Sequence, residues 1–298
     1  MRRSPFTAVP GRLAELAHPR RADLHIHTIA SDGEFTATQA GAMARQANLA
    51  AVAITDHDTL TPSDDVQAAA GEEIEVIPGI EISASFRDRE VHLLGYFIRS
   101  DNADLNRALS RIRNARRERF HEFVARLASG GTALPPDRVR LVAESSQSLG
   151  RRHLARLIVE YGFARTRAEA FHRYLSPLTR SLKPKLLVPI EEAIHLVRTA
   201  GGVASLAHPA PDLDETDFAA LAAMGLAALE AEYPWNRTSR RAQLRNVAGD
   251  LNLAVSGGSD CHGPDPSHRR IGSHGITPDE LSVLRGWRGQ SDRSTCRD

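Results

Sequence analysis

The chain has 298 residues, of which 41% are hydrophobic, so it is long enough to form one large domain or two small ones around a substantial core. Lys and Arg total 38 against 37 Asp and Glu, and this balance excludes any argument from net charge for nucleic-acid or membrane binding. The two cysteines, Cys261 and Cys296, are too few for a disulfide framework, and no apolar run is typical of a signal sequence or membrane span. We therefore expect a cytoplasmic protein.

The first predicted element is a strand that carries a His-x-His pair, His25 and His27. Alternate side chains of a strand point to the same side, so the two imidazoles would face one point while Leu24 and Ile26 face the other way. Such a pair can hold a metal ion, although buried, hydrogen-bonded histidines are the simpler interpretation of the pair alone. Asp32 follows in a Ser-Asp-Gly turn that would direct its carboxylate back over the end of the strand.

A helix and a second strand follow. Thr36 and Gln39 form a capping-box pattern, and apolar residues continue at helical spacing to about Asn48, which predicts a helix. The apolar run at 51–54 is typical of a strand buried on both faces, and it leads directly into Thr55-Asp56-His57-Asp58. Polar groups therefore follow the end of a strand for a second time.

Two further extended runs carry one candidate group each. After a predicted helix at 63–70, the chain passes through Pro78-Gly79 into a segment that contains Glu81. The next run, 91–98, has His92 near its start. Both segments are apolar enough to be strands of the same sheet.

The pattern changes at about residue 99. A long helix is predicted from about residue 101 to 130, and three more helices follow without any strand pattern, at 136–144, 151–161 and 166–175. We therefore expect a helical insertion over 99–183 in a barrel made of 1–98 and 184–285, with a polar tail at 286–298.

The alternating framework resumes after the insertion. Its predicted elements are helices at 189–200, 215–224 and 238–251 and strands at 203–206, 227–230 and 253–256. His208 follows the first of these strands, and Asp260 and His262 follow the last. Repeated strand and helix units favour a parallel sheet, and functional groups at the carboxyl ends of strands fit a barrel better than an open sheet. The expected class is α/β, with about seven strands.

Nine histidine, aspartate and glutamate side chains are candidate metal ligands. They are His25, His27, Asp32, His57, Glu81, His92, His208, Asp260 and His262. Six imidazoles and three carboxylates could serve three divalent ions if one carboxylate bridges, and nitrogen and oxygen ligands suit Mn, Fe or Zn. Clustered ions make hydroxide available at neutral pH and neutralise charge on a phosphoryl group, so hydrolysis of a phosphate ester is the chemistry that this set suits best.

These motifs resemble those of the polymerase and histidinol phosphatase (PHP) domain family. The resemblance covers about residues 21–272, and the nine candidate positions match in order, within the motifs His25-x-His27 with Asp32, 55–58, 79–81, His92, 207–209 and 258–263. It implies a distorted seven-stranded (β/α)7 barrel of the TIM type with a trinuclear metal site. By this resemblance the first ion would be held by His25, His27 and Asp260. Glu81 would bridge to a second ion held by His92 and His208, and the third would be held by Asp32, His57 and His262.

The helical insertion and the segment 149–156 most resemble a bacterial branch of this family that acts on nucleotides. Its members remove the 3′-phosphate from nucleoside 3′,5′-bisphosphates or trim short RNA from a 5′-monophosphate end. By resemblance Arg151 and His153 are candidate substrate contacts, with Lys185 a third, and the planar guanidinium of Arg151 suits bidentate phosphate binding. Arg152 departs from the pattern, because relatives commonly carry proline there.

Several polar residues near these motifs have simpler explanations. Asp56 and Asp58 are expected to support neighbouring groups, and Cys261 to point away from Asp260 and His262 into packing. The first helix of the insertion carries arginines that could follow a nucleic-acid backbone, although most charged helix faces simply meet water. These are Arg107, Arg111, Arg113, Arg116, Arg117, Arg119 and Arg126.

We therefore expect a metal-dependent phosphoesterase that uses a metal-activated hydroxide as nucleophile and no catalytic side chain. Nucleotides or short RNA would be its substrates and phosphate a product, with neither a membrane nor an obligate protein partner involved. A histidinol-phosphate-type phosphatase of a small non-nucleotide ester is the alternative enzyme. A non-catalytic nucleic-acid-binding or regulatory module is the alternative from another class.

Overall fold

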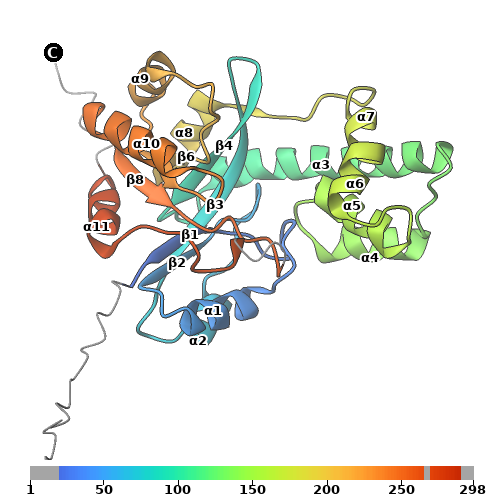
Figure 1. Cartoon of the computed structure of the whole chain (residues 1–298), viewed down its shortest axis with the longest axis horizontal. Helices are drawn as coiled ribbons and strands as arrows, with labels where there is room; N and C mark the ends of the chain where they lie inside the picture. Colours follow the sequence, from blue (N-terminus) through green and yellow to red (C-terminus); the bar gives the residue numbers. More distant parts are fainter. Residues whose placement is uncertain (1–19, 265–268, 290–298) are drawn as a thin grey trace, which may run out of the picture.

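A mixed sheet, nearly closed into a barrel, is the framework of the computed structural model, which describes residues 20–264 and 269–289 (Figure 1). Within these residues the strands neighbour one another in the order β1-β2-β3-β4-β6-β7-β8, and β5 pairs with β3. Their bounds are β1 Ala22–Ile26, β2 Ala51–Ile54, β3 Glu75–Phe86, β4 Arg89–Tyr96, β5 Val188–Pro189, β6 Val203–Leu206, β7 Ala228–Glu232 and β8 Ala254–Gly257. The predicted α/β barrel class is confirmed.

The outermost strands of this order, β1 and β8, meet just beyond their carboxyl ends. Ile26 forms an isolated parallel bridge with Cys261, and the N–H of His27 donates to the Cys261 carbonyl over 2.9 Å. Gly258 makes this approach possible, because a Cβ atom there would lie 2.3 Å from the backbone nitrogen of His25. The segments that follow β1 and β8 are thereby held side by side.

Strand β4 is antiparallel to both β3 and β6, so the expectation of a parallel sheet is wrong in this part of the barrel. A two-residue turn joins β3 to β4, and its residues Arg87 and Asp88 have φ of 49° and 60°, the left-handed conformation of a tight hairpin. Asn-Gly or Asp-Gly usually signals such a turn, and Arg-Asp does not. Glu81 and His92 consequently lie within a long hairpin rather than at the carboxyl ends of parallel strands.

Helices cover the outside of the barrel and bury apolar side chains against its strands. They are α1 Ala37–Gln46, α2 Asp64–Ala70, α8 Ile190–Thr199, α9 Glu215–Ala223, α10 Thr238–Asp250 and α11 Pro278–Gly286. The capping box predicted from Thr36 and Gln39 is present at the start of α1. The sequence patterns predict neither the two-residue β5 nor α11, although Thr277 and Glu280 form a capping box at the start of α11.

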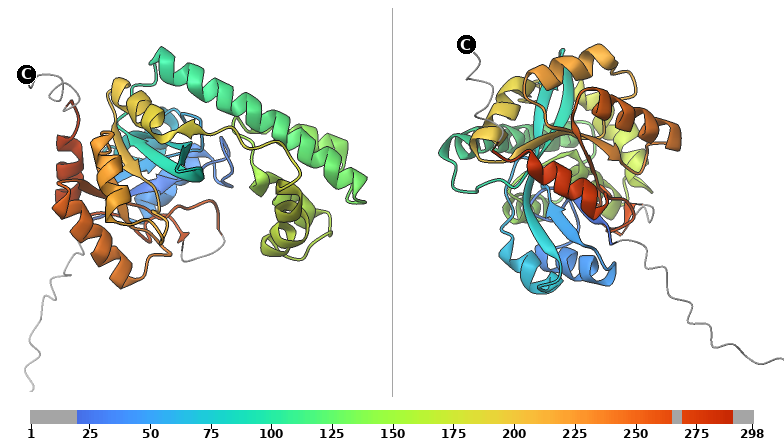
Figure 2. Two further views of the ribbon diagram at one scale, coloured as in Figure 1. Left: turned by 90° about the horizontal axis from the view of Figure 1, so that it is seen from above. Right: turned by 90° about the vertical axis from the view of Figure 1, so that its left-hand side faces the viewer.

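The remaining helices form a separate layer beside the barrel. They are α3 Ala103–Ser129, α4 Pro136–Ser145, α5 Arg151–Glu160, α6 Arg167–Ala170, a π-helical turn at Phe171–Leu175 and α7 Ser176–Thr179. Helix α3 runs outward from the barrel, and the shorter helices lie along it (Figure 2). They share an apolar core with α3 that contains Phe120, Phe123 and Leu154. The helices predicted in this segment are confirmed, with the last one divided at the π-helical turn.

The domain boundaries at 98/99, 183/184 and 285/286 stay predictions. The ends of the chain that they include, residues 1–19 and 290–298, lie outside the described residues. Among the described helices, none combines the length and the apolar composition that a bilayer crossing requires.

Candidate metal centre

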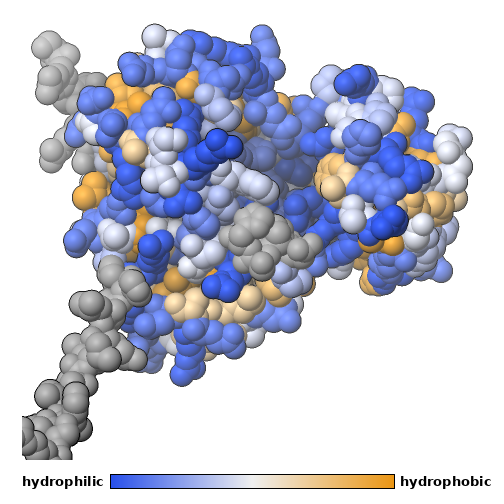
Figure 3. Space-filling model, viewed as in Figure 1, coloured by the Kyte–Doolittle hydropathy of each residue, from blue (hydrophilic) through white to orange (hydrophobic). Residues whose placement is uncertain are grey.

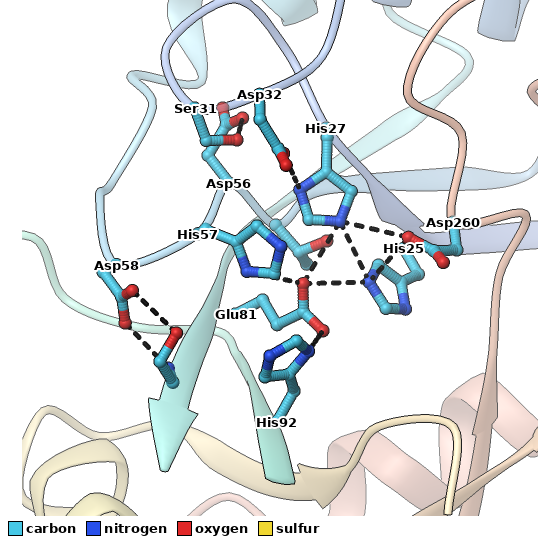
Figure 4. A network of polar contacts seen from close by, with 12 residues as sticks. His25, His27, Ser31, Asp32, Asp56, His57, Asp58, Glu81, His92 and Asp260 are labelled. Carbon is cyan, nitrogen blue, oxygen red and sulfur yellow. Dashed lines mark hydrogen bonds and ion pairs between the residues drawn. The ribbon is translucent and has the colours of Figure 1, made fainter. Parts of the chain in front are cut away.

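Glu81 lies at the centre of the cluster that contains the candidate metal ligands. Its Oε2 atom is 3.3 Å from Nε2 of His25, 3.2 Å from Nε2 of His27 and 3.0 Å from Nδ1 of His57. His25 is in β1 and His27 directly follows it, so the two imidazoles reach the cluster from one face, as the His-x-His spacing predicts. Figure 4 shows these side chains converging on the Glu81 carboxylate.

The second oxygen of Glu81 faces a different pair of histidines. Its Oε1 atom is 3.0 Å from Nδ1 of His92 and 3.0 Å from Nε2 of His208. His92 pairs across the hairpin with Ser83, so it lies diagonally beside Glu81 on the same face of the sheet. The carboxylate therefore has one oxygen toward each group of histidines, which is the arrangement of a bridging ligand.

A second group of candidate ligands lies next to His27. It consists of Asp32, His57 and His262. Asp32 Oδ1 is 3.4 Å from Nε2 of His262 and 3.9 Å from Nδ1 of His27, and the rings of His27 and His262 stack with centroids 4.0 Å apart. One ligand atom from each of His27, Asp32, His57 and His262 lies within 4.8 Å of the others. His27 thus stands between two groups rather than belonging to one.

Asp260 completes the side near His25. Its Oδ1 atom is 3.4 Å from Nε2 of His25 and 3.2 Å from Nε2 of His27. All nine side chains predicted to be ligands are accordingly brought into one connected cluster. Their role as ligands stays a prediction.

The spacing and the unsatisfied atoms of the cluster fit divalent cations. Zn–N distances of about 2.0–2.1 Å place neighbouring ligand atoms of a tetrahedral site about 3.3 Å apart, close to the separations around Glu81. Four polar atoms of the cluster are buried without a hydrogen-bond partner: His27 Nδ1, Asp32 Oδ1, His57 Nδ1 and Glu81 Oε2. Unpaired buried polar atoms are costly, so four of them gathered at one point fit a site for cations.

The protonation states of the cluster also suit cation binding. Burial raises the pKa of Glu81, but the surrounding histidines, His57 first, hold it well below its usual range. Burial lowers the pKa of His262 to about 3 and that of His57 well below its usual range, so both imidazoles are neutral at pH 7. Burial also lowers the pKa of His25, but Glu230 and Glu81 outweigh it and raise the value to about 10. A bound cation must displace the His25 proton.

Glu230 contacts a candidate ligand directly, although the sequence motifs do not include it. It is fully buried, its Oε1 accepts a hydrogen bond from Nδ1 of His25 over 2.8 Å, and its Oε2 accepts from the backbone N–H of His208 over 2.6 Å. This contact leaves the Nε2 of His25 directed at the cluster. A signal was present, because Glu230 is the last residue of the strand predicted at 227–230.

Glu230→Gln is expected to weaken metal binding by about 10–100-fold, the usual cost of losing the carboxylate behind a ligating histidine. The amide can still accept from His25, but it lacks the charge that raises the basicity of the imidazole. Titration of the metal-free protein with Mn²⁺ or Zn²⁺ measures the change. Glu191→Gln, at an exposed position on α8, is the matched control, and equal affinities for the two variants would contradict the assignment.

The comparisons with known proteins decide the family. The family model described as the PHP domain matches residues 23–174, about half of the chain. The chain belongs to the PHP domain family.

Several known proteins are similar to this PHP chain over most of its length. A 5′-3′ exoribonuclease Rnm of Escherichia coli is 31% identical over 82% of this chain and 86% of its own, and a 3′,5′-nucleoside bisphosphate phosphatase of Chromobacterium violaceum is 30% identical over 84% and 90%. A phosphoribosyl 1,2-cyclic phosphate 1,2-diphosphodiesterase of Eggerthella lenta is 29% identical over 81% and 94%. A crystal structure of a metal-dependent phosphoesterase of Bifidobacterium adolescentis superposes with a TM-score of 0.81 at 30% identity, over 91% of this chain and 98% of that one. The chain is a metal-dependent phosphoesterase, as predicted.

Asp56 and Asp58 support the loops of the PHP site. Asp56 accepts hydrogen bonds from Thr28 and from the hydroxyl of Ser31, which fixes the turn that presents Asp32. Asp58 accepts from the backbone N–H and hydroxyl of Ser83 and from Arg116 of α3. Cys261 is fully buried in an apolar cluster with Ile26.

A cavity of about 350 Å³ lies between the barrel and helices α3 and α5. Part of its lining is aromatic, with Phe120 and Phe123, and part is cationic, with Arg119, Arg151 and Lys185. In the space-filling view, the region between the barrel and the helical layer is a hollow with a mainly hydrophilic surface (Figure 3). The structure thus places two of the three predicted substrate contacts, Arg151 and Lys185, in one cavity.

A second cavity, of about 320 Å³, borders the candidate metal centre. It is lined by His92 and His208, and it shares Glu90 and Arg151 with the first cavity. Lys185 of the first cavity donates from Nζ to Oε1 of Glu90 over 2.5 Å, and that oxygen lies 3.2 Å from Nε2 of His92. The two cavities therefore adjoin at Glu90 and Arg151.

His153, the third predicted substrate contact, lines neither cavity. Its side chain is buried, and its Nδ1 accepts a hydrogen bond from the N–H of Gly150 at the start of α5 over 3.1 Å. Burial lowers its pKa, so the ring is neutral at pH 7. In this structure His153 fixes the first turn of the helix that carries Arg151.

The arginines of α3 divide between internal contacts and the surface. Arg113 and Arg116 bond to Asp58, and Arg117 donates to the Ala143 carbonyl over 2.8 Å. Arg107 is paired with Asp104 at the surface. Several of these side chains therefore hold the helical layer together or against the barrel, and are not part of an exposed basic stripe.

Proposed function

We propose that this enzyme removes the 3′-phosphate from nucleoside 3′,5′-bisphosphates, and that it trims short RNA from a 5′-monophosphate end through the same contacts. The observation that carries this proposal is the pair of adjoining cavities that share Arg151 and Glu90. One of them borders the candidate metal centre, and the other combines aromatic side chains with Arg119 and Lys185. A nucleoside bisphosphate matches this order of surfaces. Its reacting phosphate would lie at the candidate metal centre, and the nucleoside and the second phosphate would lie in the adjoining cavity.

Three ions would be held as the family resemblance implies. His25, His27 and Asp260 would hold the first, and Glu81 would bridge to the second. That second ion would be held by His92 and His208, and the third by Asp32, His57 and His262. When bound, such ions supply Lewis acids for the phosphoryl oxygens and water of lowered pKa at neutral pH.

The protein's own groups would then bind and orient the substrate. Arg151 and Lys185 would contact phosphoryl oxygens, since charge-assisted hydrogen bonds to phosphate are the strong ones and a guanidinium can make two in parallel. His153 would act by fixing the start of α5 rather than by direct contact. Phe120 and Phe123, which border this cavity from the apolar core of the helical layer, would form an apolar wall beside the nucleoside. A cytoplasmic setting, where nucleotides and RNA fragments are processed, is part of the proposal.

A substrate panel tests the proposal. The protein would be loaded with Mn²⁺, Fe²⁺ or Zn²⁺ and given a nucleoside 3′,5′-bisphosphate, a 5′-phosphorylated RNA trinucleotide, a nucleoside 5′-monophosphate and histidinol phosphate. We expect phosphate release from the bisphosphate and nucleotide release from the trinucleotide, each with kcat/KM at least tenfold above that for histidinol phosphate. Preferred turnover of histidinol phosphate would favour the small-ester phosphatase instead, and no turnover of any compound by metal-loaded protein would favour the binding module.

A further inference from the structure

Two arginines, Arg152 and Arg269, flank the metal centre beside its candidate aspartates. Arg152 is in the first turn of α5, and its Nε lies 3.7 Å from Oδ2 of Asp32, beyond hydrogen-bonding distance. Nη2 of Arg269 donates to Oδ2 and to the carbonyl oxygen of Asp260, and it lies 3.3 Å from Nδ1 of His262. The two side chains thus reach the cluster from different segments of the chain.

Each arginine faces the aspartate oxygen that points away from the histidines, Oδ2 of Asp32 for Arg152 and Oδ2 of Asp260 for Arg269. In Asp32 it is Oδ1 that faces His262, and in Asp260 it is Oδ1 that faces His25 and His27. The Oδ2 atoms face Arg152 and Arg269, and the hydroxyl of Tyr233 also donates to Oδ2 of Asp260 over 3.1 Å. The guanidinium groups therefore leave the Oδ1 atoms available to metal ions.

Each guanidinium has a buried donor that nothing in the described residues accepts. The Nε atoms of Arg152 and Arg269 are both buried without a hydrogen-bond partner, although the side chains as a whole are 27% and 13% exposed. An N–H buried without an acceptor costs about 1–3 kcal/mol, more when the group is charged. Two such donors beside one cluster indicate an acceptor that arrives from outside.

The charge around these donors also favours an anion. Both guanidinium groups lie beside His262, since Nη2 of Arg269 is 3.3 Å from its Nδ1 and Asp32, which faces Arg152, is 3.4 Å from its Nε2. The amino end of α5 lies here as well, since a Cβ atom on its N-cap residue Gly150 would be 3.9 Å from Oδ2 of Asp32. The first N–H groups of a helix and its dipole add positive potential at that end.

We propose that Arg152 and Arg269 together bind oxygens of the phosphoryl group that is hydrolysed, at the Asp32–Asp260 side of the metal centre. Arg151 and Lys185 lie near His92 instead, so the reacting phosphate is held from two parts of the cluster. Both arginines are placed to contact substrate directly, and the acceptor that their Nε–H groups lack is a phosphate monoester or diester oxygen. This inference rests on the proposed phosphoesterase function and adds two binding residues to it.

Single variants of the metal-loaded enzyme test this site. Arg152→Gln and Arg269→Gln are expected to raise the inhibition constant of inorganic phosphate and the KM of the bisphosphate by about 10–100-fold, the range for losing a charged hydrogen bond of about 1.5–3 kcal/mol. The lysine variants keep the charge and should recover part of the loss. Metal content, measured by elemental analysis, should stay equal to that of the wild type. Arg140→Gln, which removes an exposed surface pair with Asp137, is the control.

Distinct results would overturn the inference. Unchanged phosphate inhibition and KM in both glutamine variants would remove the arginines from the binding site. Loss of metal from the variants, with the phosphate affinity of the metal-replete fraction unchanged, would show that the arginines only orient Asp32 and Asp260. Because calorimetric binding of inorganic phosphate to the metal-loaded protein needs no turnover, it tests the site even if no nucleotide is hydrolysed. Should a glutamine variant fail to fold, the lysine variant supplies the same comparison.

Discussion

Glu81→Gln is expected to lower kcat/KM by on the order of 10³-fold, the effect of losing several kcal/mol of metal-assisted stabilisation. The change keeps the size of the side chain but replaces a carboxylate with a neutral amide. In the wild type the two oxygens of Glu81 lie 3.0–3.3 Å from five imidazoles, on His25, His27, His57, His92 and His208. An amide presents one acceptor to one group and N–H donors to the other, so it cannot bridge two ions.

The measurement pairs activity with metal content. Elemental analysis of Glu81→Gln after dialysis should find at least one ion fewer per chain than in the wild type, and Glu192→Gln on the exposed face of α8 should lose none. Far-UV circular dichroism checks that the fold is kept, since the residue is fully enclosed. A Glu81→Gln protein with full metal content and near-normal turnover would exclude Glu81 as the bridge and require a different centre.

The fold around the centre could be predicted where the local pattern and the tertiary structure agree. The strands at 51–54 and 203–206 are short apolar runs that match β2 and β6 at both ends, because strands buried on both faces need no alternation. His25 and His27 could be placed on one face of β1 because side chains alternate along a strand. These relationships are local, and one stretch of sequence contains all of the information.

The hairpin β3–β4 could not be predicted, because its turn carries no recognisable sequence signal. Its turn uses Arg87 and Asp88 in the left-handed conformation, which their residue types do not announce. β4 pairs antiparallel with β3 directly before it and with β6, which begins only at Val203, beyond the whole helical segment. The position of His92 beside Glu81 follows from this pairing, so spacing along the chain does not reveal it.

The residues that orient the candidate ligands could not be predicted, because they are far from those ligands along the chain. Glu230 contacts His25, 205 residues away, and Asp23 accepts from the backbone N–H of Ser259, 236 residues away. Neither lies in a motif with recognisable spacing. Arg269 pairs with Asp260, nine residues away, and no sequence pattern signals this contact. A sequence pattern can nominate side chains suited to metal binding, but the partners of those side chains emerge only when the barrel closes.

Arg116→Met is expected to destabilise the protein by about 3–5 kcal/mol, the cost of leaving a buried charge without its partner. Arg116 is in α3, and its Nε donates to Oδ2 of Asp58 over 2.7 Å, with the side chains 9% and 0% exposed. It also donates to the carbonyl of Leu149, just before α5, and to the hydroxyl of Ser83 in β3. One guanidinium thus joins the barrel to α3 and to the start of α5, the two helices that line the cavity of about 350 Å³.

Urea unfolding measures this loss, and Arg107→Met on the same helix is the control, because its pair with Asp104 is 73% and 64% exposed and worth about 0–1 kcal/mol. The double variant Arg116→Met/Asp58→Asn also removes the buried, unpaired charge of Asp58, so it should recover part of the lost stability. The effects of the two changes on the free energy of unfolding should therefore not be additive. An Arg116→Met protein no less stable than Arg107→Met would mean that the helical layer is held by apolar contacts alone. Arg116 also lines the cavity of about 350 Å³ between the barrel and helices α3 and α5. Loss of its contacts should therefore raise the KM of a nucleotide more than it weakens metal binding at the barrel.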